Sequence, residues 1–182
     1  MTKINNVEMQ FQSDKRFKNM IMTNPSYQDI PDYFGAYGCL LTAHTNCYNH
    51  YNLTVKNNNN FFTLEYVNNK MIENNGYAYL YYKSLYNNDI NKIKQSCFGK
   101  EAHTLFTVLD KILNIKERVD NYTNKIDITI PNVYYIIKTK YKDTGHYSWL
   151  ISDTNKYVDS YDAIIKQASK DQILKITKII FE

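Results

Sequence analysis

A chain of 182 residues with 43% hydrophobic and 22% charged side chains has the size and composition of one globular domain, expected over 1–182. The 22 lysines and arginines exceed the 18 aspartates and glutamates by four, but they are scattered singly, which argues against nucleic-acid binding. The sequence contains no run of 18 apolar residues, so no membrane span is expected. We also expect the chain to be a monomer.

The first 30 residues contain few periodic apolar positions, and Pro25 and Pro31 indicate turns, so an extended arm is expected there. The N-terminus has no apolar stretch typical of a secretion signal. The three cysteines are an odd number without close-spaced pairs, which favours free thiols in a reducing compartment. Together these features predict a cytoplasmic location.

Helical spacing of apolar side chains dominates the next part of the chain. In the first helical segment Cys39 occupies the first turn, directly after Gly38, and in the second Thr63 offers an N-cap oxygen. The segment 77–86 is aromatic and fits either a helix or a strand. The helical segments are expected at 39–51, 63–75, 89–96 and 101–114.

After about residue 115 the pattern changes to β-branched and aromatic residues, which predict strands. Turn residues at 152–156 indicate that the strands on either side form a hairpin, and the tail at 172–181 fits a helix or a strand. Helices followed by antiparallel strands predict an α+β domain, with an N-terminal helical lobe packed on a C-terminal antiparallel sheet. The strands are expected at 126–130, 133–141, 145–151 and 157–161.

Cys39 is a candidate nucleophile because of its position at the start of a helix. A thiolate is the reactive form of cysteine, and a helix N-terminus or a neighbouring imidazolium favours it. The nucleophile also needs a base, which the fold can bring from far away in the sequence. His44 lies five residues further along the same helix and points to another side, whereas His146 opens an expected strand after Gly145.

Two further groups would complete a site for acyl transfer. Asp159 lies 13 residues after His146, across the expected hairpin, and would hold the imidazole in one tautomer. The oxyanion of the reaction also requires hydrogen-bond donors. The backbone N–H of Cys39 would supply one, and the side-chain amide of Gln12 or Gln10 on the N-terminal arm would supply another.

Four segments of the chain resemble, in the same order, the cysteine peptidases related to the leader-peptidase domain of bacteriocin exporters. The segment "QSDKRF" at 12–17 resembles their Q-x-D-x-R-W/F opening, and "AYGCLLTAHTN" at 36–46 resembles their Y-G-C-x-x-T-S nucleophile segment. "FTLEYVNNKMIENNGYAYLYYKSLY" at 62–86 is similar to the L-T-P-x-x-L-N-x-x-L-x-x-N-G-G-Y segment of bacterial and phage members. "GHYSWLI" at 145–151 and "YVDSYDA" at 157–163 resemble G-H-F-V-V-V and V-x-D-P.

The resemblance implies a papain-like fold and hydrolysis of an amide bond. It implies Cys39 as the nucleophile, His146 as the base, Asp159 as the residue that orients the base, and Gln12 as the oxyanion donor. It requires no metal or organic cofactor.

The chain departs from the family pattern directly beside the orienting residue. Ser160 stands where the family usually has proline. This departure leaves Asp153 and Asp162 open as alternatives to Asp159.

The stand-alone members that this chain resembles, which have no exporter attached, are often encoded by phages or prophages and look like cell-wall peptidases. We therefore expect a peptidoglycan endopeptidase of the endolysin type, with a peptide or peptidoglycan substrate. It would be released to the wall on lysis or carried in a phage particle. The alternatives are a protease that processes proteins or leader peptides, and an inert peptide-binding or particle component of the same fold.

A zinc site is the competing interpretation of the first helix, which carries Cys39, His44, Cys47 and His50. The last three are spaced three residues apart and drift around the helix, whereas ligand pairs on one helix usually lie at i and i+4. No fourth ligand cluster follows, so zinc is not expected.

Overall fold

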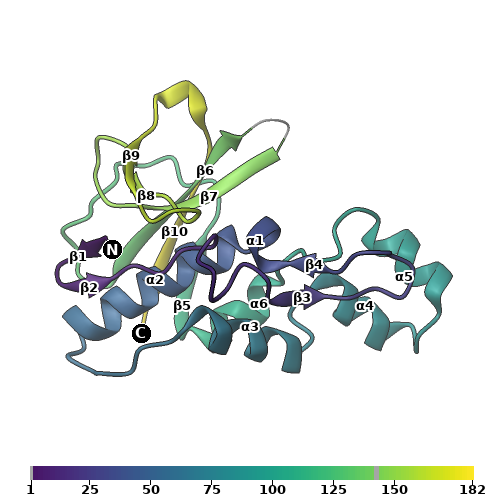
Figure 1. Ribbon diagram of the computed structural model, residues 1–182. Coiled ribbons are helices and arrows are strands. Elements are labelled where there is room, and N and C mark those ends of the chain that lie inside the picture. The colour runs from purple at the N-terminus through teal and green to yellow at the C-terminus, as the bar shows by residue number, and fades with distance from the viewer. Residues whose placement is uncertain (1, 142–143) are drawn as a thin grey trace.

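Helices form in the first two thirds of the chain and an antiparallel sheet in the last third, as expected from the sequence (Figure 1). The computed structural model describes residues 2–141 and 144–182. The helices are α1 (Phe34–Tyr37), α2 (Cys39–Thr54), α3 (Leu64–Glu73), α4 (Ala78–Leu85), α5 (Ile90–Cys97) and α6 (Phe106–Ile112), with a 3₁₀ turn η1 (Lys170–Gln172). The strands are β1 (Lys3–Ile4), β2 (Val7–Glu8), β3 (Ile21–Thr23), β4 (Asp32–Tyr33), β5 (Ile115–Val119), β6 (Val133–Tyr141), β7 (Thr144–Leu150), β8 (Lys156–Val158), β9 (Ile165–Gln167) and β10 (Ile173–Phe181).

The main sheet has the strand order β5-β10-β6-β7-β8-β9, and all of its neighbours are antiparallel. In the centre, β6 pairs with both β10 and β7, and Thr139 lies opposite His146. At the next pairing Val158 of β8 lies opposite Trp149 of β7. Because the two strands are antiparallel, the residue that follows β8, Asp159, continues toward the part of β7 that carries His146.

The sheet is buried on both faces along β6. Tyr134 and Ile136 belong to the main core, which includes the buried side chains of α2, whereas Tyr135 and Ile137 belong to a second cluster. This alternation follows from the two-residue period of a strand. The long helix α2 lies along the sheet, while α4 and α5 extend away from it (Figure 1) and close a small core of their own.

The prediction of a strand at 126–130 is wrong, because this segment is a loop. The N–H of Thr129 donates to Asp127 Oδ1 at 3.0 Å, which makes a local turn, and Pro131 has no N–H for a strand ladder. Ile126 packs on the second cluster from outside the sheet. Ile126 thus packs on the sheet without pairing with a strand, whereas Ile128 and Ile130 are exposed.

Most of the other expected elements are confirmed, with shifts at their ends. Thr63 caps α3 by accepting from the N–H of Tyr66 at 3.1 Å, the ambiguous segment 77–86 forms α4, and the tail forms β10. The helix expected from 101 starts only at Phe106. The strand expected at 157–161 ends at 158, and β5 and β9 were not expected.

The N-terminal arm is extended but is not free of structure. Asn5 and Asn6 both have positive φ, 48° and 67°, and form the two-residue turn between β1 and β2. Further along the arm, Arg16 Nη2 lies 2.6 Å from Asp14 Oδ2. None of the described helices is long and apolar enough to cross a membrane.

Candidate active site

The junction between α1 and α2 places Cys39 at the first position of the longer helix, with a half-buried side chain. A Cβ atom at Gly38 would lie 2.4 Å from the buried ring of Phe34, so only glycine fits at this bend. A Cβ atom at Gly35 would lie 2.8 Å from the carbonyl oxygen of Lys18, which brings the N-terminal arm close to the same bend. The first-turn N–H groups of a helix have no intrahelical acceptor, so the thiol lies beside a cluster of donors.

His146 links the cysteine to a carboxylate. Its Nε2–H donates to Asp159 Oδ1 at 2.8 Å, which leaves Nδ1 as the ring nitrogen available to the Cys39 thiol. Burial lowers the pKa of His146, but hydrogen bonds to Asp159 and to Cys39 more than offset this effect and raise the pKa to about 9. The ring is therefore protonated at neutral pH.

Asp159 follows β8 directly and has a side chain that is 9% exposed. Its Oδ1 also accepts the N–H of Tyr161 at 2.8 Å, and its Oδ2 accepts from Lys166 Nζ at 2.6 Å. Burial raises the pKa of this carboxyl, but the bonds to His146, Lys166 and the Tyr161 N–H outweigh burial and hold it well below its usual range. Asp159 therefore stays ionised.

The two alternative carboxylates have other partners. Asp162 Oδ2 accepts from Lys166 Nζ at 2.9 Å, and Asp153 lies in an exposed turn beside Ser152. Of the three candidates, Asp159 is the one bonded to His146. The β7–β8 pairing explains why Asp159 binds His146, because β8 ends at Val158 and the chain continues from there toward the imidazole.

Gln12 and Gln10 take different positions on the arm. Gln12 is buried, its Nε2 donates to the carbonyl oxygen of Gly35 at 2.8 Å, and its Oε1 has no partner among the described residues. Its backbone N–H donates to the carbonyl oxygen of Ser160 at 2.7 Å, so Gln12 lies between the turn before Cys39 and the residue after Asp159. Among the described residues, the Gln12 side chain forms no hydrogen bond with Cys39.

Gln10 has a structural role instead. Its side-chain amide donates to the carbonyl oxygen of Phe62 at 2.7 Å and accepts the N–H of Leu64 at 2.9 Å. Its backbone exchanges hydrogen bonds with the Asn46 side chain. Gln10 thus joins the arm to α2 and to the start of α3.

The two histidines of α2, His44 and His50, lie away from this site in separate environments. His44 is buried, its Nδ1–H donates to the carbonyl oxygen of Leu40 at 2.8 Å, and its Nε2 accepts from Arg118 at 3.1 Å. Burial and the Arg118 charge lower the pKa of His44 to about 3. Within residues 2–141 and 144–182, no group of three or more histidine, cysteine, aspartate or glutamate side chains is arranged to hold a metal ion.

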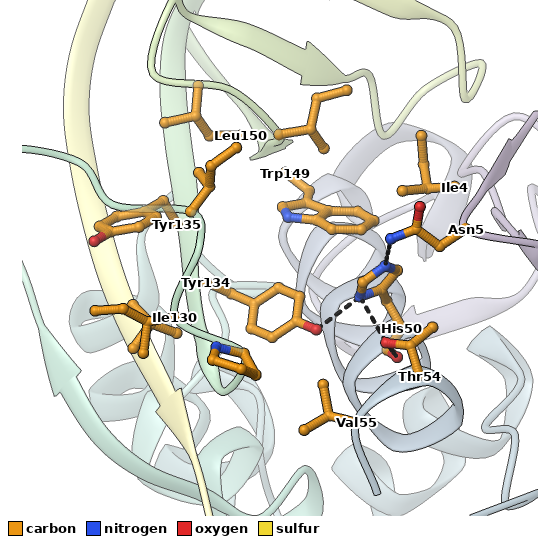
Figure 2. A pocket seen from close by; sticks show the side chains of 14 residues that line it. Ile4, Asn5, His50, Thr54, Val55, Ile130, Tyr134, Tyr135, Trp149 and Leu150 are labelled. Carbon is orange, nitrogen blue, oxygen red and sulfur yellow. Dashed lines mark hydrogen bonds between the residues drawn. The ribbon is translucent and has the colours of Figure 1, made fainter. Parts of the chain in front are cut away.

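A pocket of about 360 Å³ lies beside the C-terminal half of α2 (Figure 2). The ring of His50 lies between Asn5 and Tyr134, with Nδ1 2.7 Å from the Tyr134 hydroxyl and Nε2 3.1 Å from the Asn5 amide. Burial lowers the pKa of His50 to about 4, so the ring is neutral. None of the side chains that line this pocket is charged, and neither Cys39 nor His146 is among them.

Sequence reasoning missed Lys166 and the backbone N–H of Tyr161, which both bind Asp159. The "KYVDSYDAIIKQ" segment contains a usable pattern, because residues on either side of a tight hairpin loop lie opposite each other. The missed strand β9, which is only three residues long, pairs Lys166 with Tyr157. Recognising β9 would have brought this lysine next to the end of β8.

Comparison of the chain with protein-family models, with the curated proteins and with the solved structures finds no match.

Proposed function

We propose that this chain is a cysteine peptidase with a papain-like fold, which hydrolyses an amide bond. The observation that carries the proposal is the hydrogen bond between Asp159 and the His146 ring, together with Cys39 at the start of α2, whose thiol helps to raise the pKa of that ring. A cysteine with no catalytic role would not need a protonated imidazole and a buried, ionised carboxylate aligned behind it. The family resemblance of four sequence segments supports the same assignment.

In the proposed reaction the Cys39 thiolate adds to the carbonyl carbon of the substrate. The Cys39 N–H and the second hydrogen of the Gln12 amide would donate to the oxyanion, since the first hydrogen already binds Gly35. As the C–N bond breaks, the His146 imidazolium gives its Nδ1 proton to the leaving amine. Neutral His146 then takes a proton from water, which adds to the thioester and releases the acid and the thiolate.

For the substrate we propose the peptide part of peptidoglycan, either the stem or the cross-bridge. The support is the likeness of this chain to stand-alone phage and bacterial members of the resembled family, together with a net charge of +4 that favours anionic cell walls. The protein would then act at the wall after lysis or from a phage particle.

Alkylation of the three cysteines tests the catalytic pair directly. Cys47 and Cys97 are buried, and burial raises the pKa of both thiols, so they serve as internal controls. With iodoacetamide at pH 6, Cys39 should react at least about 10-fold faster than either control. Equal labelling of all three cysteines, read by mass spectrometry, would favour an inert peptide-binding component.

Digestion of purified cell walls tests the substrate. The wild-type protein and Cys47→Ala should clear the wall and release defined muropeptides, whereas Cys39→Ala should not. If Cys39→Ala clears the wall as fast as the wild type, the peptidase assignment is wrong. If the wild type leaves the wall intact but cleaves a protein or leader peptide, the substrate is a protein.

A further inference from the structure

Asp159 shares its carboxylate between two cations. The Nε2–H of His146 and the N–H of Tyr161 both donate to Oδ1, whereas Lys166 donates to Oδ2 at 2.6 Å. The lysine is held in place by a second bond, from Nζ to Asp162 Oδ2 at 2.9 Å. Its side chain is 39% exposed, so it reaches the site from the solvent side of the β8–β9 hairpin.

The loop between β8 and β9 is built to hold this geometry. Ala163 has a positive φ of 58°, and its N–H donates to the carbonyl oxygen of Asp159 at 2.8 Å. The N–H of Asp159 in turn donates to the carbonyl oxygen of Ile164 at 2.9 Å. These bonds close the loop between Asp159 and the strand that carries Lys166, so the two side chains meet across a fixed turn.

We infer that Lys166 is a positioning residue of the candidate active site, which keeps Asp159 ionised and in place when His146 releases its proton. The inference rests on the proposed function. During hydrolysis His146 alternates between imidazolium and imidazole, so Asp159 loses its cationic partner when the leaving amine takes the proton and regains it when His146 takes a proton from water. A buried carboxylate without a counter-charge is costly, and Lys166 supplies a counter-charge that does not change during the reaction.

A permanent cation bound to Oδ2 also weakens the electrostatic attraction between the Asp159 carboxylate and the His146 imidazolium. The proton on Nε2 stays between the ring and Asp159, and the Nδ1 proton is the one that moves to the leaving amine. Without Lys166 the carboxylate would attract the imidazolium more strongly, and the imidazolium would become a poorer acid. Among residues 2–141 and 144–182, the titratable groups around the pair are Cys39 on α2, Tyr141 on β6, Tyr157 on β8, and Asp162 and Lys166 on the β8–β9 hairpin.

Proton NMR titration of the His146 ring in Cys39→Ala protein tests the inference without any need for hydrolysis. Lys166→Met should raise the pKa of His146 by about 0.5 to 1 unit, and Lys166→Arg should leave it within about 0.2 unit. Lys166→Gln, which retains donors but no charge, should act like Lys166→Met. The matched control is Lys156→Met, which removes the same charge from an exposed position on β8 and should shift the pKa by less than about 0.2 unit.

An unchanged or lowered pKa in Lys166→Met, or an equal rise in Lys156→Met, would overturn the inference. Near-UV circular dichroism identifies a variant that does not fold, and Lys166→Gln then decides the question. In the protein with Cys39, the alkaline limb of the pH–rate profile should move upward in Lys166→Met by the same amount. If no substrate is hydrolysed but the NMR shift is found, the proposed function fails and the role of Lys166 at Asp159 stands.

Discussion

His44 and His146 both lie near the interface of α2 and the sheet, His44 buried and His146 half-buried, and their environments are opposite. Nε2 of His44 accepts a hydrogen bond from Arg118, whereas Nε2 of His146 donates one to Asp159. Burial lowers the pKa of both rings, but the pKa of His44 falls to about 3 and that of His146 rises to about 9. Burial has the largest effect on the pKa of both rings, but the Arg118 charge adds to it at His44, whereas the bonds to Asp159 and Cys39 outweigh it at His146.

The neighbours of the two rings differ as well. Arg118 is itself bound by Asp110 through two hydrogen bonds, and its guanidinium lies 4.2 Å from the centre of the Phe106 ring. This cluster joins α2, α6 and β5, and its charged side chains are partly buried. The His146 ring instead lies beside a half-buried thiol, so one of its nitrogens can exchange a proton with a bound molecule.

The largest expected effect is on the proposed hydrolysis. His146→Ala should reduce the rate by about 10²- to 10⁴-fold, because the general acid and base are lost, while the protein remains folded. His44→Gln should retain the rate within about 10-fold and lower the free energy of unfolding by about 1–3 kcal/mol. Wall-digestion rates and urea unfolding of both variants measure the contrast, and a loss of activity in His44→Gln as large as in His146→Ala would contradict it.

The next effect is on the pH dependence of stability, where the two histidines should act in opposite directions. The folded-state pKa of His146 lies above the ordinary value of 6.5, so its stabilisation is present below pH 6.5 and is lost as the pH rises toward 9. The folded-state pKa of His44 lies below 6.5, so its contribution is present above pH 6.5 and is lost as the pH falls toward 3. Each contribution is at most a few kcal/mol.

Urea unfolding between pH 4 and about pH 9 separates the two contributions. The free energy of unfolding of His146→Gln should depend less on pH than that of the wild type on the alkaline side. His44→Gln should depend less on pH on the acid side, although His50 and His103, whose pKa values are also lowered, retain part of the acid slope. Parallel curves for the wild type and both variants would mean that neither ring has a shifted pKa.

The smallest expected effect comes from Arg118→Lys. Burial of His44 and a positive charge beside it are retained, but the two bonds to Asp110 and the stacking on Phe106 are weakened. Stability should fall by about 1 kcal/mol with no change in the alkylation rate of Cys39. Slower alkylation in this variant would show that the His44 cluster and the Cys39 site are coupled, and would break the distinction between them.

Local patterns in the sequence were sufficient for the elements that carry the candidate site. Gly38 before Cys39 predicted the helix start, and the β-branched and aromatic run around His146 predicted its strand. These predictions succeed because helix starts and strand alternation depend on neighbouring residues. They fail at 126–130, where the same alternation belongs to a loop that covers the sheet, since a strand also needs a partner for its backbone.

The sequence by itself determined that the main helices precede the main sheet, the position of Cys39 at a helix N-terminus and a short set of candidate partners. Only the tertiary structure decided which carboxylate meets His146, that Lys166 binds the same carboxylate, and that His44 meets an arginine instead of an acid. The physical reason is that these pairings depend on strand register and on loop closure between distant segments. A shift of one residue in register would turn His146, Lys166 or Arg118, which all lie on strands, to the other face of the sheet.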